Sequence, residues 1–113
     1  MSTKDFLLQL GITPDLLGYY YLTELINRRR EIIKDPKQVT AYSTMNEYKL
    51  VAESYDTVAS AVERCCRHAI HHICKTPNEF INVLCKGNLF NRTRPTNTGF
   101  ICTVAEYLNN KGE

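Results

Sequence analysis

The stretch 57–75 combines basic, histidine and thiol side chains at the spacing of a helix with two chemically different sides. At about 100° per residue, its apolar positions fall on one side of a helix. The opposite side carries Ser60, Arg64, Arg67, His71 and Lys75. Arginine can bind a guanine edge through two hydrogen bonds, and Glu63 could accept one from a cytosine amino group. The pattern indicates a helix that reads DNA in the major groove, although a solvated polar face is the plainer interpretation of the same spacing.

The distribution of charge supports double-stranded DNA as the partner, whereas the total charge does not. The 113 residues include 14 Lys and Arg against 12 Asp and Glu, a net charge of only +2. Between Ser60 and Arg94, however, six basic residues stand against two acidic ones, a local balance of +4, and the rest of the chain carries −2. Because phosphate contacts supply much of the affinity for DNA, this local excess favours DNA binding.

A helix-turn-helix pattern at about residues 46–75 would position these side chains. Val51 and Ala52 precede a tight connection, and Val62 follows ten positions after the alanine. A small alanine lets two helices cross closely, and a later β-branched residue fills the crossing. Asp56 occupies the turn where glycine is usual, and aspartate tolerates the left-handed conformation better than most residues do.

Helical periodicity runs through nearly the whole chain. The sequence predicts six helices: one capped by Ser2 or Thr3 and ended by Gly11, then 17–34, 46–54, 57–75 and 76–87, and a last one from Thr96 or Asn97 through Leu108. Only residues 38–44 have some strand character, and this segment is too short and isolated to form a sheet. We expect one all-α domain that spans residues 1–113.

Length and composition exclude several classes of protein. No apolar run approaches the ~18 residues of a membrane span, and the N-terminus lacks a secretory signal. The five cysteines are odd in number and form no CxxC pair, which favours free thiols in a reducing compartment over a disulfide framework. We therefore expect a cytoplasmic, nucleoid-associated protein with no membrane partner.

Thiols and imidazoles on one helix raise a metal hypothesis. Cys65, His68 and His72 lie at helical offsets of 0, 3 and 7, which would suit three ligands on one side. No fourth ligand is near in sequence, so we expect no metal and no cofactor. Catalysis would need a nucleophile with a base and an orienting group, and the thiols fall mostly on the apolar side. The sequence therefore predicts a protein that is not an enzyme.

The run Arg28-Arg29-Arg30 could meet an acidic partner or a phosphate group. Arg29 falls on the apolar stripe of its helix, where its stem could pass the edge of the core. We interpret the run as a solvated helix end.

Two motifs resemble the DNA-binding effector domain of the stage-zero sporulation protein A family of response regulators. Residues 62–70, VERCCRHAI, are similar to that family's VERAIRHAI-type recognition helix, within a gapless similarity from Tyr48 to Ile73. Residues 94–101, RPTNTGFI, are similar to its KPTNSEFI segment, and GYYYL at 18–22 to its GYLYL stretch. The resemblance is weak over most of the chain and specific at the first two motifs.

The resemblance implies an all-helical effector domain that binds a short DNA box and regulates transcription in sporulation. It assigns base and phosphate contacts to Ser60, Glu63, Arg64 and Arg67, and a backbone contact to Arg94. It also implies head-to-tail homodimers on tandem boxes, partly through the last helix, and RNA polymerase as a further partner.

Three departures from the family pattern shape these expectations. Ala61 stands where the family has a basic residue in the recognition helix, which removes one DNA contact. The segment Val39–Glu47 is a few residues longer than the family's link. The chain leaves no room for the family's receiver domain, so we expect an output domain without control by phosphate on an attached receiver. The alternative is an interaction module that pairs with or competes against a full-length sporulation regulator without activating transcription.

Overall fold

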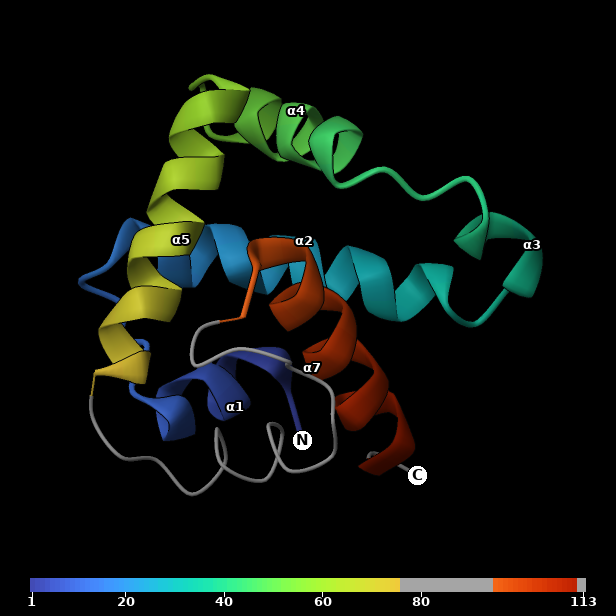
Figure 1. The fold of residues 1–113 in the computed structure, drawn as a ribbon, viewed down its shortest axis with the longest axis horizontal. Helices are drawn as coiled ribbons and strands as arrows, with labels where there is room; N and C mark the ends of the chain where they lie inside the picture. Colours follow the sequence, from blue (N-terminus) through green and yellow to red (C-terminus); the bar gives the residue numbers. More distant parts are fainter. Residues whose placement is uncertain (76–94, 112–113) are drawn as a thin grey trace.

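A computed structural model describes residues 1–75 and 95–111, and every regular element in these two ranges is a helix. The helices are α1 (Thr3–Leu10), α2 (Leu17–Ile32), α3 (Pro36–Val39), α4 (Thr44–Ser54), α5 (Ala59–Cys74) and α7 (Asn97–Lys111) (Figure 1). The predicted all-α class is confirmed. The predicted helix over 76–87 lies outside the described residues.

The described ranges hold six helices, and the short α3 is one that the sequence did not predict. Asp35 is its N-cap, because the carboxylate accepts a hydrogen bond from the Lys37 amide, and Pro36 supplies a first position whose φ is already fixed. The Asp-Pro pair therefore both follows α2 and starts α3. The strand character of 38–44 does not produce a strand.

Capping residues set the ends of α1 and α4. Ser2 accepts an amide hydrogen bond from the first turn of α1, and Gly11 closes that helix with a φ of 100°, both at the predicted positions. Ser43 accepts a hydrogen bond from the Asn46 amide at 3.3 Å. α4 therefore begins two residues before the predicted start, because the serine cap precedes the apolar periodicity.

α2 lies at the centre of the described fold, and α1, α4, α5 and α7 all pack against it (Figure 1). Its residues Leu22, Leu25 and Ile26 are fully buried. The other helices contribute Phe6, Leu7, Leu10, Tyr48, Val51, Val62, Ile70, Phe100, Ile101, Val104 and Leu108 to the same core. Because burying one such side chain is worth roughly 1.5–3 kcal/mol, this core holds α5 in place relative to the other helices.

The arginine run at the end of α2 is used inside the fold. Arg28 donates from Nε to Glu47 Oε1 at 2.5 Å and so joins α2 to α4. Arg30 donates from Nε to Asn109 Oδ1 at 2.8 Å and so joins α2 to α7. The guanidinium of half-buried Arg29 lies over an aromatic ring of the link before α4, 4.4 Å from the ring centre. Arg28 is exposed and Arg29 half-buried, as the interpretation of this run expected, but the run also has partners inside the protein and is not only a solvated helix end.

Candidate nucleic-acid interface

The predicted helix-turn-helix is formed by α4 and α5, which are joined by the turn 55–58. Asp56 has a φ of 53°, a left-handed conformation that no other non-glycine residue of the described ranges adopts. The carbonyl oxygen of Ala52 accepts an amide hydrogen bond from the turn at 3.0 Å, which closes the end of α4. Ala52 and Val62 are 3% and 0% exposed, so the two helices cross closely as their spacing predicted.

One side of α5 is built into the core. Its buried residues are Val62, Cys66, Ala69, Ile70 and Ile73. Burial raises the pKa of the Cys66 thiol, which keeps this residue neutral. Val58, predicted on the same stripe, is instead 62% exposed. The prediction fails there because α5 begins only at Ala59, and the extended backbone of its N-cap Val58 does not follow helical spacing.

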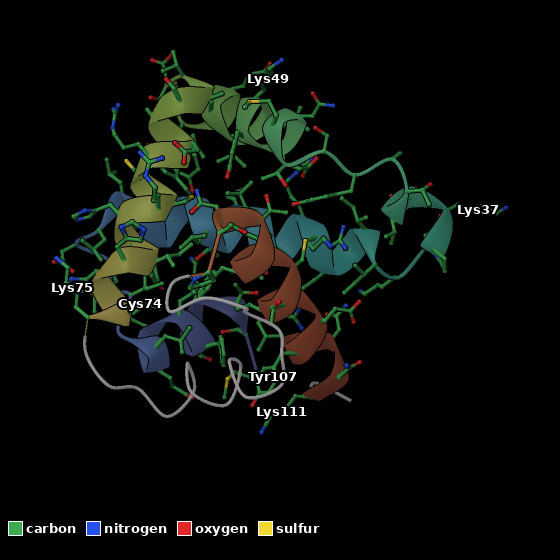
Figure 2. All side chains as sticks on the ribbon, in the orientation of Figure 1. Lys37, Lys49, Cys74, Lys75, Tyr107 and Lys111 are labelled. Carbon is green, nitrogen blue, oxygen red and sulfur yellow. The ribbon has the colours of Figure 1, made fainter. Side chains whose placement is uncertain are left out.

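The opposite side of α5, called here its exposed side, carries the predicted DNA-contacting residues. Ser60, Arg64, Arg67 and Lys75 are exposed, whereas Glu63 and His71 are half-buried. Figure 2 shows Lys75 beyond the last turn of α5, projecting from the edge of the molecule. His68 is also exposed and was missed by the sequence prediction, although at ~100° per residue it lies only about 40° from Arg64. Arg94 lies outside the described residues.

Glu63 and Arg67 form an ion pair across one turn of α5. Arg67 Nη1 lies 2.6 Å from Glu63 Oε2, and the two side chains are 50% and 32% exposed. A solvated pair of this kind adds only about 0.3–0.5 kcal/mol to stability. Its main effect is on geometry, because it orients the Arg67 guanidinium along α5 and occupies one of the two carboxylate oxygens of Glu63.

The Pro-Thr-Asn segment contacts this helix at the start of α7. Thr96 Oγ1 accepts a hydrogen bond from the Gly99 amide at 3.0 Å and caps α7, while Pro95 is buried. Asn97 is 9% exposed, and its Nδ2 donates to the carbonyl oxygen of Glu63 at 3.0 Å. Sequence reasoning considered Asn97 only as an alternative cap of α7 and missed its contact with α5, and the signal that could have identified that contact is its place in the motif shared with the family.

The N-terminus of α5 adds an attraction for phosphate. The N-cap Val58 makes no side-chain hydrogen bond to the helix, and the first turn of this described helix holds no acidic residue. A helix N-terminus carries roughly half a positive charge and presents free amide groups to an anion. Arg64 extends this positive region along the exposed side, and the hydroxyl of Ser60 beside it is a neutral hydrogen-bond donor.

A family comparison connects this geometry to a known class of protein. Residues 3–108 match the family model described as "Sporulation initiation factor Spo0A C terminal". The chain belongs to this family. It is therefore a sporulation-related DNA-binding effector domain that serves transcription regulation, and the family is not a catalytic one. The match includes both helices of the helix-turn-helix and the Pro-Thr-Asn segment.

The metal hypothesis finds no support in the described part of this effector domain. Within residues 1–75 and 95–111, no three His, Cys, Asp or Glu side chains are grouped so that they could hold a metal ion. Cys65, His68 and His72 share one helix but do not converge on a point. Across the same residues, no helix is both long and apolar enough to cross a membrane.

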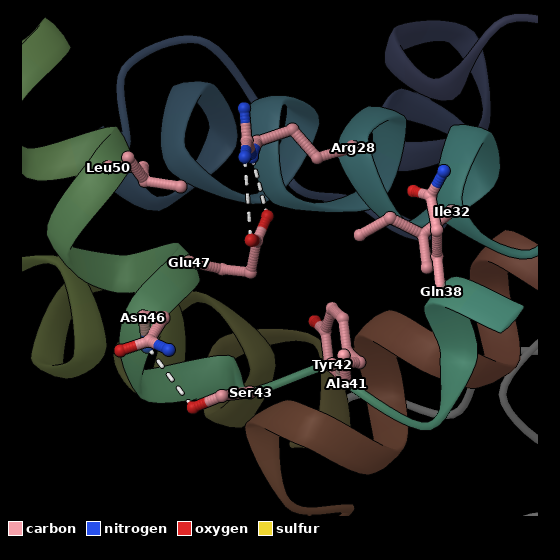
Figure 3. Close-up of a pocket in the computed structure, with 9 residues that line it drawn as sticks. All are labelled: Arg28, Ile32, Gln38, Ala41, Tyr42, Ser43, Asn46, Glu47 and Leu50. Carbon is pink, nitrogen blue, oxygen red and sulfur yellow. Dashed lines mark hydrogen bonds and ion pairs between the residues drawn. The ribbon is translucent and has the colours of Figure 1, made fainter.

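A groove of about 410 Å³ lies between α2, α3 and α4 of the effector domain, and no residue of α5 lines it (Figure 3). Arg28 and Glu47 face each other in this groove and neutralise each other's charge. Burial raises the pKa of Tyr42, which also lines the groove, to about 12, so its phenol stays neutral. Without net positive charge in its lining, the groove does not resemble a phosphate site.

Proposed function

We propose that this effector domain is a sequence-specific transcription regulator that inserts α5 into the major groove of its DNA box. The observation that carries the proposal is the division of α5 into a buried apolar side and an exposed side with Arg64, Arg67 and Lys75. A major groove about 12 Å wide admits an α-helix, and helix-turn-helix proteins present this kind of side to the base edges.

Base recognition falls to the middle of α5. Arg64 is exposed, and none of the ion pairs among the described residues involves it, so its guanidinium is available for the O6 and N7 atoms of a guanine. Arg67 is already oriented by Glu63 and binds a phosphate or a second guanine. Glu63 keeps one carboxylate oxygen with which it accepts a hydrogen bond from a cytosine amino group.

Phosphate contacts come from the two ends of the same helix. We propose that Ser60, next to the N-terminus of α5, contacts a phosphate group of one DNA strand. His71 and Lys75, in and just after the last turn, are assigned to the other strand. Arg94, which directly precedes buried Pro95 in the chain, supplies a backbone contact by its match to the family motif.

Family membership supports two further assignments. We propose that two copies bind tandem boxes head to tail, partly through α7, and that the resulting pair contacts RNA polymerase. The alternative role, pairing with or competing against a full-length regulator without activation, is favoured by Ala61, which removes a positive charge from α5. A reporter gene behind tandem boxes distinguishes the two roles. A competitor lowers the reporter expression that a full-length regulator produces, whereas an activating domain does not.

The direct test measures binding to a duplex selected from random sequence by the wild-type domain, as a function of salt concentration. We expect affinity to fall steeply with salt, and Arg67→Ala to reduce the slope of log K against log salt by about 1. Lys37→Ala is the matched control, because Figure 2 shows Lys37 on α3 at the opposite end of the molecule from Lys75. No measurable binding at low salt would contradict the proposal.

The proposed role of Arg94 has its own signature. Since a phosphate contact carries no sequence information, Arg94→Ala should weaken binding to the selected duplex and to a scrambled duplex by the same factor. A loss confined to the selected duplex would show that Arg94 contacts a base instead.

A further inference from the structure

Three polar contacts from the first turn of α7 reach both helices of the helix-turn-helix. Asn97 Nδ2 donates to Tyr48 Oη of α4 at 3.2 Å and to the Glu63 carbonyl oxygen of α5 at 3.0 Å. Thr98 Oγ1 lies 2.9 Å from Thr44 Oγ1, at the start of α4. One residue, Asn97, therefore contacts α4 and α5 together, and the exposed Thr98 contact reaches α4 alone.

Asn97 uses both of its amide hydrogens inside the protein. The residue is 9% exposed and Tyr48 is 5% exposed, so water cannot readily replace either hydrogen bond. Burial raises the pKa of Tyr48, so its phenol stays neutral, and the phenol oxygen accepts the hydrogen bond from Asn97. A buried amide whose two hydrogens are both bonded to protein groups has a preferred orientation, and it restricts the groups that it contacts.

We infer that Asn97 is a positioning residue for DNA recognition, an inference that rests on the proposed function. Its bond ends on the backbone carbonyl oxygen of Glu63, directly before Arg64, in the first half of α5. The same residue lies two positions after Pro95, the buried residue that follows Arg94 in the chain. Asn97 thereby fixes the base-reading helix α5 relative to α4 and to the first turn of α7.

The fixed position of α5 matters more for the sequence specificity of DNA binding than for the electrostatic attraction to DNA. Phosphate attraction acts over roughly 10 Å and tolerates small shifts, whereas a bidentate arginine–guanine contact depends on hydrogen-bond geometry. A small rotation of α5 would therefore weaken the contacts to the selected sequence and leave non-specific binding almost unchanged. The quantity to measure is the ratio of affinities for the selected duplex and a scrambled duplex of equal length.

The chain offers matched variants for this measurement. Asn97→Ala removes both hydrogen bonds without adding charge. Tyr48→Phe removes only the contact to α4 and leaves the Asn97 bond to Glu63 in place. Thr98→Ala removes the exposed contact to Thr44.

We expect Asn97→Ala to lower the affinity ratio by about tenfold. A change of this size corresponds to the net free energy of about one hydrogen bond, which is what a misplaced arginine–guanine contact would lose. Tyr48→Phe and Thr98→Ala should stay within about twofold of wild type, and the salt dependence of all three should match wild type. Circular dichroism at the assay temperature checks that each variant is folded. If Asn97→Ala does not fold, Asn97→Ser, which replaces the amide with a shorter hydroxyl donor, is measured instead with the same expectation of a reduced ratio.

Several outcomes would overturn the inference. They are a folded Asn97 variant whose ratio equals that of wild type, equal losses in all three variants, and failure of both Asn97 variants to fold, which would assign the residue to global stability. A wild-type domain that does not distinguish the selected duplex from the scrambled one would instead refute the proposed function. The two failures are therefore separable within one experiment.

Discussion

Replacing Gly18 by alanine tests whether the approach of α2 to α5 is as close as the structure shows. A Cβ atom at this position would lie 2.5 Å from the carbonyl oxygen of Cys65 and 2.6 Å from the Cβ of Ala69. Both distances are well below van der Waals contact, and both partners belong to α5, one of them through its backbone. The helices must separate or shift to accept the methyl group.

The expected cost follows from two opposing effects. Overpacking a well-packed contact costs about 1–3 kcal/mol, and the upper part of this range applies because a backbone atom cannot change rotamer. Alanine recovers up to about 1 kcal/mol of helix propensity, and less in the first turn of α2, where Gly18 lies. We therefore expect Gly18→Ala to lower the free energy of unfolding by about 2 kcal/mol, equivalent to roughly 8 °C in melting temperature.

Urea unfolding followed by far-ultraviolet circular dichroism is the suitable assay, because the chain has no tryptophan for a fluorescence signal. Leu17→Ala is the matched control in the same turn of α2, since Leu17 is 59% exposed, and it should change stability by less than about 0.5 kcal/mol. Adding Ala69→Gly to Gly18→Ala should restore only part of the loss, because the carbonyl oxygen of Cys65 remains. A Gly18→Ala domain as stable as wild type would refute the close approach of these helices.

Three further predictions concern recognition, an ion pair and pH. Arg64→Ala should cost about 1–3 kcal/mol of discrimination at one base pair, measured by competition with single-base-pair variants, and equal losses at every position would contradict its role. Arg28→Ala should destabilise the fold by about 1–2 kcal/mol in urea, because it leaves the Glu47 side chain, 10% exposed, without its partner. Lys34→Ala, which breaks a pair with side chains 62% and 74% exposed, should cost less than about 0.5 kcal/mol, and equal costs for the two changes would show that burial is irrelevant here. The pKa of Tyr42 is raised from 10.0 to about 12 by burial, so the stabilisation from its neutral phenol is complete below pH 10 and is lost as pH rises towards 12. Tyr42→Phe should reduce the loss of stability between pH 9 and pH 11, and an undiminished loss would contradict the burial of this phenol.

Local sequence signals were sufficient for the helix-turn-helix. The spacing of Ala52 and Val62 and the position of Asp56 depend on residues within one supersecondary unit, and the structure confirms the crossing and the left-handed turn. Val58 shows the limit of such reasoning, because periodicity does not reveal where a helix begins when no side chain caps it. The exposed side of α5 followed from the same periodicity, apart from His68, which is exposed but was not predicted, and His71, which was predicted there but is half-buried. The DNA contacts assigned to that side stay a prediction.

Amino-acid sequence alone determined the all-α class, the two sides of α5 and membership in the sporulation effector family. These properties depend on helical period, caps and short motifs, which are local. Tertiary structure alone decided the partners of the arginine run, the close contact at Gly18 and the place of Asn97 between α4 and α5. Arg30 meets Asn109 across 79 positions of sequence, and Asn97 meets Glu63 across 34. Pairings at such separations depend on how whole helices pack around α2, because packing brings distant residues together in ways that no local pattern specifies.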